Sequence, residues 1–218
     1  MRALGLALGC AVGAVLPLGG HAQDVGARLT GRAPAEVVRA VQDIARSATA
    51  DGLPVEPLIQ KAIEGSAKGV APDRVIAAVR TLAARLADAR GALRAGGIAT
   101  PSPEAVEGGA YGLNAGLNAS AVRDLARISR PPYDAALTLR VAATLAALGV
   151  PGTQVVRLVQ GMITTGRAPS ELLDLPGQAQ ANMARGATPA EAAEGLARGA
   201  GHVPLSPPRR GPPSPQHP

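Results

Sequence analysis

The sequence predicts an all-α protein, and three observations support this fold class. Apolar residues recur at helical spacing through most of the chain, and the alternating pattern of a β-strand is missing. Glycine followed by proline stands where that helical period stops and restarts. Residues 52–76 recur without a gap as residues 149–173. We therefore expect two related three-helix units, about 34–95 and 131–186, packed side by side as a small helical array.

The recurrence is carried by glycine, proline and apolar positions. Leu58 and Ile59 correspond to Val155 and Val156, so apolar residues meet apolar residues between the fixed points. The fixed points of the first copy return at the same spacing in the second, with Gly52, Pro54, Gly69, Ala71 and Pro72 matched by Gly149, Pro151, Gly166, Ala168 and Pro169. The pattern indicates a duplicated helix–turn–helix–turn–helix segment.

Four glycine–proline junctions predict helix ends. A glycine just past an apolar run can adopt the left-handed conformation that closes a helix, and a proline a few residues later suits the first turn of the next one. These junctions are Gly31 with Pro34, Gly69 with Pro72, Gly166 with Pro169, and Gly186 with Pro189. Thr188 and Glu191 also have the spacing of a capping box. We interpret these glycines and prolines as marking the ends and starts of helices, in preference to loops that bind a ligand.

The N-terminus predicts a signal peptide over residues 1–22. Arg2 precedes an apolar run, and Gly20-His21-Ala22 fits a cleavage site after Ala22. The alternative is lipoprotein processing at Cys10, the single cysteine. We expect an exported chain, periplasmic or secreted, with no transmembrane span after processing. Loss of Arg2 would reduce the formal net charge of +6 by one. As a binding signal this surplus favours acidic envelope surfaces over nucleic acid, but a solvated surface with an excess of Arg is the simpler interpretation.

The elements of the first half follow from the apolar period. After a short lead-in at 23–31, helices are expected at about 34–50, 55–68 and 72–95. The region 96–118 is rich in glycine and predicts a connector, with at most a short helix from Glu104 to Glu107. A binding loop is the alternative for this connector.

The second half is expected to depart from the first near its end. Helices are predicted at about 120–129, 133–148 and 152–165, and another begins at Pro169. Leu175-Pro176-Gly177 should interrupt that helix, so that a short one restarts near 178–185 and a last one spans 189–198. The proline-rich tail, 200–218, cannot bury an apolar face and is expected to be disordered.

The sequence offers no recognised catalytic, cofactor or metal site. The histidines that follow the predicted signal peptide, His202 and His217, both lie in the tail, which argues against Ser-His catalysis and histidine metal sites. Phosphate-binding glycine motifs are absent. The chain has no Phe or Trp and two Tyr residues, Tyr111 and Tyr133, so base-stacking platforms are lacking.

Two charged groupings remain as weaker candidates. Glu56 and Glu64 lie eight residues apart on one predicted helix and could serve acid–base chemistry, as in a glycosidase. Lys61, Lys68 and Arg74 form a basic face beside Glu64. Solvated helix-face charge is the simpler interpretation of both.

The grouping of the helices resembles tetratricopeptide and HEAT arrays in size, although the signature positions of those repeats are absent. We expect an exported, non-enzymatic, helical protein- or peptide-interaction module. The alternative is a module that adheres to anionic envelope material through Arg and Lys. A third possibility is an enzyme with an unrecognised carboxylate site.

Overall fold

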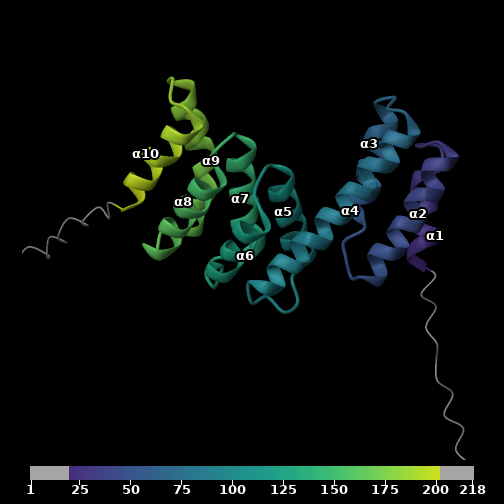
Figure 1. Cartoon of the computed structure of the whole chain (residues 1–218), viewed down its shortest axis with the longest axis horizontal. Coiled ribbons are helices and arrows are strands. Elements are labelled where there is room, and N and C mark those ends of the chain that lie inside the picture. Colours follow the sequence, from purple (N-terminus) through teal and green to yellow (C-terminus); the bar gives the residue numbers. More distant parts are fainter. Residues whose placement is uncertain (1–19, 202–218) are drawn as a thin grey trace, which may run out of the picture.

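The computed structural model describes residues 20–201, which are helical and contain no strand (Figure 1). The prediction of an all-α protein is confirmed for these residues. The elements are α1 (Gly20–Leu29), α2 (Ala35–Ala50), α3 (Glu56–Ala67), α4 (Pro72–Ala95), α5 (Pro103–Asn114), α6 (Ala119–Ile128), α7 (Ala135–Ala147), α8 (Gly152–Thr164), α9 (Pro169–Ala184) and α10 (Pro189–Gly201).

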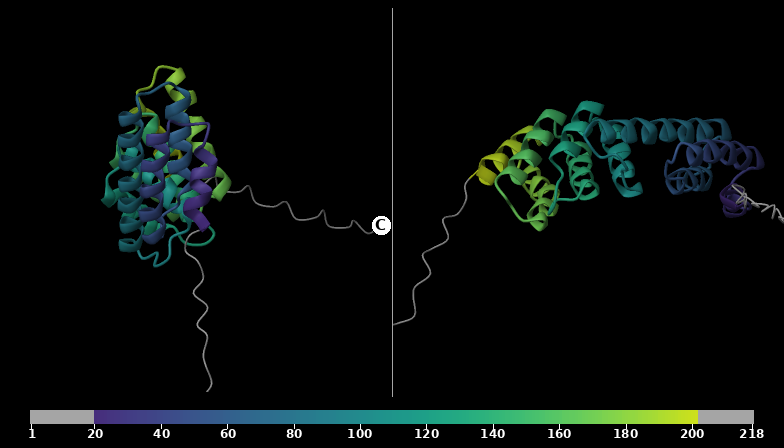
Figure 2. Two further views of the ribbon diagram at one scale, coloured as in Figure 1. Left: turned by 90° about the vertical axis from the view of Figure 1, so that its right-hand side faces the viewer. Right: turned by 90° about the horizontal axis from the view of Figure 1, so that it is seen from below.

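The helices form an elongated array in which sequential helices lie side by side (Figures 1 and 2). Helix α5 packs on α7 and α7 on α9, while α4 packs on α6, α6 on α8 and α8 on α10. Each helix therefore buries its apolar stripe against near neighbours in the chain. This is the packing logic of a helical solenoid.

Helix α4 joins the two ends of this array. At 24 residues it is about 36 Å long, twice the length of α3 or α5. Near its start it packs on α3, where Gly65 lies against Val75, and farther along it packs on α5, where Gly109 lies against Ala89. Helix α2 also packs on α4, and α6 meets its C-terminal end at Gly96.

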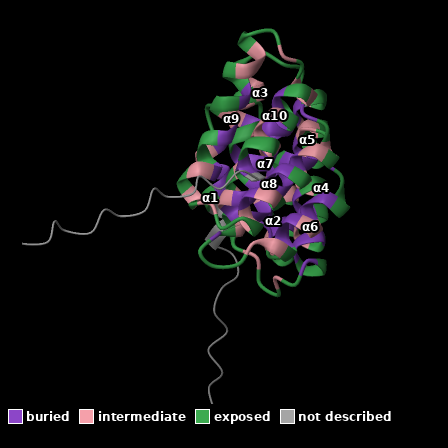
Figure 3. Cartoon of the chain, turned by 90° about the vertical axis from the view of Figure 1, so that its left-hand side faces the viewer, coloured by how far each residue is buried: buried purple, intermediate pink, exposed green. Residues whose placement is uncertain are grey.

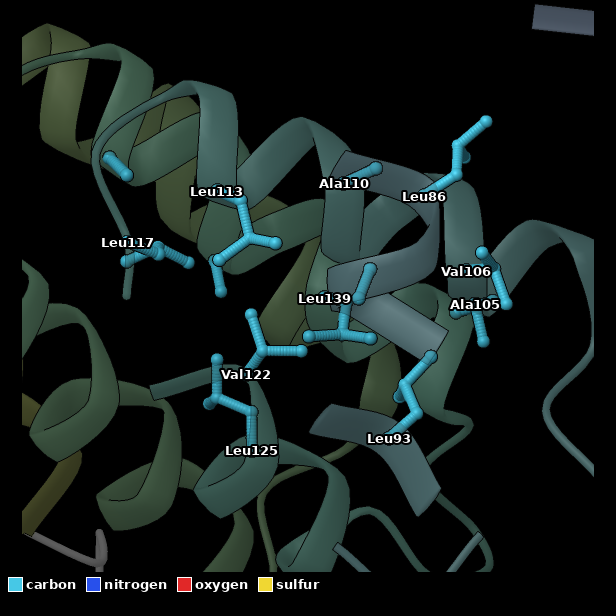
Figure 4. Packing of buried hydrophobic residues seen from close by; sticks show 14 of the residues in the cluster. Leu86, Leu93, Ala105, Val106, Ala110, Leu113, Leu117, Val122, Leu125 and Leu139 are labelled. Carbon is cyan, nitrogen blue, oxygen red and sulfur yellow. The ribbon is translucent and has the colours of Figure 1, made fainter. Parts of the chain in front are cut away.

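The core consists mainly of Leu, Val, Ile and Ala side chains, and the buried segments line the inside of the array (Figure 3). Around Leu139 of α7, Figure 4 shows the side chains of Val106 and Leu113 from α5 and of Val122 and Leu125 from α6. Small side chains let helix axes approach closely, but each buries less apolar area than an aromatic ring would. The core is therefore stabilised by many contacts between small side chains along the array, in place of a few contacts between large ones.

The glycines of all four predicted glycine–proline junctions adopt the left-handed conformation. Their φ angles are 76° at Gly31, 67° at Gly69, 68° at Gly166 and 100° at Gly186. The expected capping box is also present, because the Glu191 side chain accepts the Thr188 backbone N–H at 2.8 Å and the Thr188 hydroxyl accepts the Glu191 N–H. The prediction that these residues mark the ends and starts of helices is confirmed.

The expectation of at most a short helix within the connector 96–118 is wrong. This region contains the 12-residue helix α5, and its side chains Val106 and Leu113 are buried. Its glycines serve close packing, since a Cβ on Gly109 would lie 3.0 Å from that of Ala89 and one on Gly108 would lie 3.2 Å from that of Leu139. As a result, α5 stands with α6 between the predicted units 34–95 and 131–186, which were expected to pack side by side (Figure 1).

Three smaller boundaries also differ from the prediction. Helix α9 continues through Pro176 from Pro169 to Ala184, because the stripe of Leu172, Leu175 and Ala179 is buried on the array. The expected lead-in at 23–31 contains most of α1, whose Val25 and Leu29 are buried. Helix α10 reaches Gly201, so the start of the tail predicted at residue 200 is helical, and Ala200 is buried.

Part of the predicted terminal features lies outside the described residues. Residues 1–19 of the predicted signal peptide, including Cys10, and residues 202–218 of the tail fall there. Helix α1 begins at Gly20, within the predicted segment 1–22. Export and processing after Ala22 therefore stay predictions.

Candidate functional site

A groove lies along α4 between α3 and α5, and we call it the α4 groove. Its volume is about 590 Å³, it is open to solvent, and its lining is mostly apolar. It is lined by Pro57 and Lys61 of α3, by Ala78, Thr81, Leu82, Arg85 and Leu86 of α4, by Glu104, Glu107, Gly108, Ala110, Tyr111 and Asn114 of α5, and by Arg140 of α7. A volume in this range is typical of a site for a compact ligand or several side chains of a partner.

The floor of the groove is one side of α4. Val75, Val79 and Leu93 of this helix are buried in the core. Leu82 is half-buried and Ala78 is partly covered, so this side carries apolar surface that the array does not fully cover. The floor arises because the broad apolar stripe of α4 extends past the area that α3 and α5 protect.

One wall of the groove is α5, which presents the ring of Tyr111. The helix is fixed at its start by Ser102, whose hydroxyl accepts the Ala105 N–H at 3.2 Å. Tyr111 is 54% exposed and is one of two aromatic residues in the chain. The other, Tyr133, is buried and its hydroxyl donates to the Arg167 carbonyl. An exposed tyrosine beside an apolar floor is a common anchor of binding surfaces.

Charges of both signs border the floor. Glu104 and Glu107 lie one turn apart on α5, whereas Lys61 comes from α3 and Arg85 from α4. Burial raises the pKa of Glu107, the neighbouring Glu104 raises it further, and Arg140 opposes the shift. Lys61 is 3.4 Å from a carboxylate oxygen of Glu64, and Arg85 is 3.8 Å from one of Asp88. The groove therefore has an acidic α5 wall with Arg140 of α7 beside it, and basic groups on its α3 and α4 sides.

A second hollow of about 340 Å³ lies between α8 and α10. Gln154, Arg157, Glu194 and Arg198 contribute to its lining, which is more polar than that of the α4 groove. It is smaller and offers no aromatic side chain. The α4 groove is the better candidate for a binding site.

The two charged groupings singled out from the sequence have structural partners. Glu56 accepts hydrogen bonds from Arg28 of α1 at 2.5 and 2.7 Å and from Gln60 at 2.7 Å. Glu64 forms exposed ion pairs with Lys61 and Lys68, two of the three residues of the proposed basic face. Neither Glu56 nor Glu64 lines the α4 groove.

Comparison with protein-family models, with curated proteins and with solved structures gave no match. The candidate site therefore rests on its geometry. Within residues 20–201, no cluster of three or more His, Cys, Asp or Glu side chains could hold a metal ion. The same stretch lacks a helix with the length and hydropathy of a membrane span, in agreement with the prediction for the processed chain.

Sequence reasoning missed the α4 groove as a site. The sequence analysis places Tyr111 in the connector 96–118, for which a binding loop is only the alternative. Tyr111 follows Glu104 by seven residues and Glu107 by four. This spacing can be read from the sequence, and in a helix it places the three side chains on one side. The glycines around them concealed that helix.

Proposed function

We propose that this chain is an exported, non-enzymatic interaction module that binds a segment of a partner protein in the α4 groove. One observation carries the proposal: the apolar floor of α4 lies open beside Tyr111, which is more than half exposed. Such a surface costs solvation free energy when it stays in water and recovers that free energy when a partner covers it. The two signs of charge along its walls would orient the partner.

We also propose that 34–95 and 131–186 descend from one duplicated three-helix unit. The equivalent glycines Gly69 and Gly166 have φ angles of 67° and 68°, and Gly52 and Gly149 have 65° and 89°. These matched helix ends support the proposal. In this interpretation α5 and α6 complete the array between the copies.

Site-specific photo-crosslinking tests the binding role. A photo-reactive amino acid replaces Tyr111 in one variant of the full chain and Leu173 of α9 in the control variant, and both are expressed in the source cells. The two positions are matched in exposure, at 54% and 53%. Position 111 should give a discrete crosslinked protein that position 173 does not. Equal products from both positions, or none from position 111, would contradict binding in the groove.

Salt separates this proposal from adhesion to anionic envelope material through Arg and Lys. Attachment by exposed charge weakens sharply as ionic strength rises, because the Debye length shortens from about 10 Å at 0.1 M to about 3 Å at 1 M. Contact through an apolar floor should persist. Release of the protein from envelope fractions by salt, together with loss of the crosslink at position 111, would favour the adhesion alternative.

A further inference from the structure

We propose that the occupant of the α4 groove is an amphipathic helix of another protein, with an apolar stripe flanked by basic residues on one side and acidic residues on the other. This inference rests on the proposed function and specifies the class of partner. It follows from the separation of the two walls of the groove, the spacing of its lining residues and the arrangement of its charges.

The two walls of the groove do not pack closely on each other. Helix α3 packs on α4 at Val75 and α5 packs on it at Ala89, whereas α3 and α5 form no extensive contact with one another. Elsewhere in the array, neighbours such as α5 and α7 or α7 and α9 pack directly. A helix of about three turns, the length of α3 and α5, would match its walls.

The lining residues also favour a helical occupant. Ala78, Leu82 and Leu86 follow one another at helical spacing on the floor, and Glu107, Ala110 and Tyr111 do so on α5. Two helices side by side present rows of side chains into which the ridges of a third helix fit. An extended proline-rich segment would instead need several aromatic rings, and the groove offers one.

The charges define the flanks of the partner. Glu104 and Glu107 on α5 would face basic side chains, and Lys61 and Arg85 would face acidic ones. Glu107 is partly desolvated, so a cation from the partner would compensate a carboxylate that burial disfavours. A helix with one basic and one acidic flank can satisfy both sides in one orientation along the groove. The flank order therefore selects the direction in which the partner helix runs.

Binding of synthetic peptides to the full chain tests this inference. Three fluorescein-labelled peptides of about 15 residues share a leucine stripe at i, i+3/i+4 and i+7 and can form a helix of sufficient length. Their flanks are Lys on one side and Glu on the other, Lys on both sides, or Glu on both sides. A fourth peptide with the sequence of residues 202–218 represents an extended proline-rich ligand. Fluorescence anisotropy gives Kd, and circular dichroism reports helix formed on binding.

The mixed-flank peptide should bind several-fold to about tenfold more tightly than either single-charge peptide, and it should gain helix when bound. Tyr111→Ala should weaken all helical peptides. Glu104→Lys with Glu107→Lys should shift the preference to the peptide with Glu on both flanks, while Lys61→Glu with Arg85→Glu should shift it to the peptide with Lys on both flanks. Asp43→Lys, in an exposed ion pair on α2, is the control and should change nothing.

The outcomes distinguish this inference from the function on which it rests. Binding of the proline-rich peptide in a Tyr111-dependent way, with no binding of the helical peptides, would overturn the inference and leave the proposed function intact. Equal affinity for the three helical peptides, unaffected by the charge-reversal variants, would also overturn it. Absence of a Tyr111-specific crosslink in the source cells would overturn the proposed function itself.

Discussion

The contact between the end of α4 and α6 can be tested with a single methyl group. Gly96 is buried with φ of −80°, which an alanine adopts without strain. A Cβ placed there would lie 2.6 Å from the Ala126 Cβ and 2.7 Å from the Arg123 carbonyl oxygen. Carbon atoms in contact normally lie about 3.5–4.0 Å apart, so α4 and α6 would have to separate by roughly 1 Å. Overpacking of this kind typically costs about 1–3 kcal/mol.

Gly91→Ala on the same helix is the matched control for Gly96→Ala. Gly91 is exposed, and a Cβ there would meet nothing within 4 Å. This substitution should stabilise the protein by about 0.5–1 kcal/mol, because alanine loses less conformational freedom than glycine in a helix. The two variants should therefore differ in sign. Each kcal/mol corresponds to about 2–4 °C in Tm for a chain of this size.

Urea unfolding followed by far-UV circular dichroism measures both variants, since the chain has no tryptophan to report by fluorescence. The slope of each transition must also be compared, because an array of this type can lose one end before the other. If Gly96→Ala were as stable as Gly91→Ala, α4 and α6 would not approach each other as described. The placement of α6 against α4 would then be wrong.

Three further substitutions test other parts of the structure. Leu113→Ala should lower the free energy of unfolding in urea by at least about 2 kcal/mol, because Leu113 is buried on α5. Asn114→Ala, at the exposed neighbouring position, is the control and should be close to neutral. Equal effects of the two substitutions would indicate that this segment is not packed as a helix. Glu107→Gln should stabilise the protein relative to wild type as pH rises above the ordinary carboxyl pKa of 4.5, because burial raises the pKa of Glu107 and charging it disfavours folding; parallel pH profiles would refute this. The hydrogen bond from Arg28 lowers the pKa of Glu56 to about 2, so Arg28→Gln should remove a stability that is present above pH 4.5 and lost as pH falls through about 2. At neutral pH the cost should stay below about 1 kcal/mol because the pair is solvent-exposed, and a larger loss would contradict that view.

The sequence predicted the helices that depend on local signals. Apolar periodicity and the glycine–proline junctions placed α2, α3, α4, α7 and α8 within one or two residues, because Gly69 and Gly166 act on their own helix ends. Helix α5 escaped prediction because the role of its glycines is set by distant residues. Gly109 permits contact with Ala89, and that proximity is a property of the folded array. Pro176 escaped for a similar reason, since burial of Leu172 and Leu175 outweighs the local cost of proline.

The candidate site was less accessible to prediction than the fold. Its walls come from α3 and α5, which are separated in sequence by the whole of α4. Periodicity identifies the buried stripe of a helix but cannot indicate how much of that stripe its neighbours leave uncovered. On α4, the part of the apolar stripe that its neighbours leave uncovered forms the floor of the groove.

Because α4 is long, a small bend at its centre produces a measurable displacement at its ends. Helix α3 packs on α4 near its start, at Val75, and α5 packs farther along, at Ala89, so the two walls of the groove rest on different parts of a helix whose half-length is about 18 Å. Long helices curve gently, and a bend of roughly 5° at the centre would move the far end of each arm by about 1.6 Å. That displacement is comparable to one methyl group. A change in the curvature of α4 would thus change the width of the α4 groove without disturbing the packing at either end of the helix.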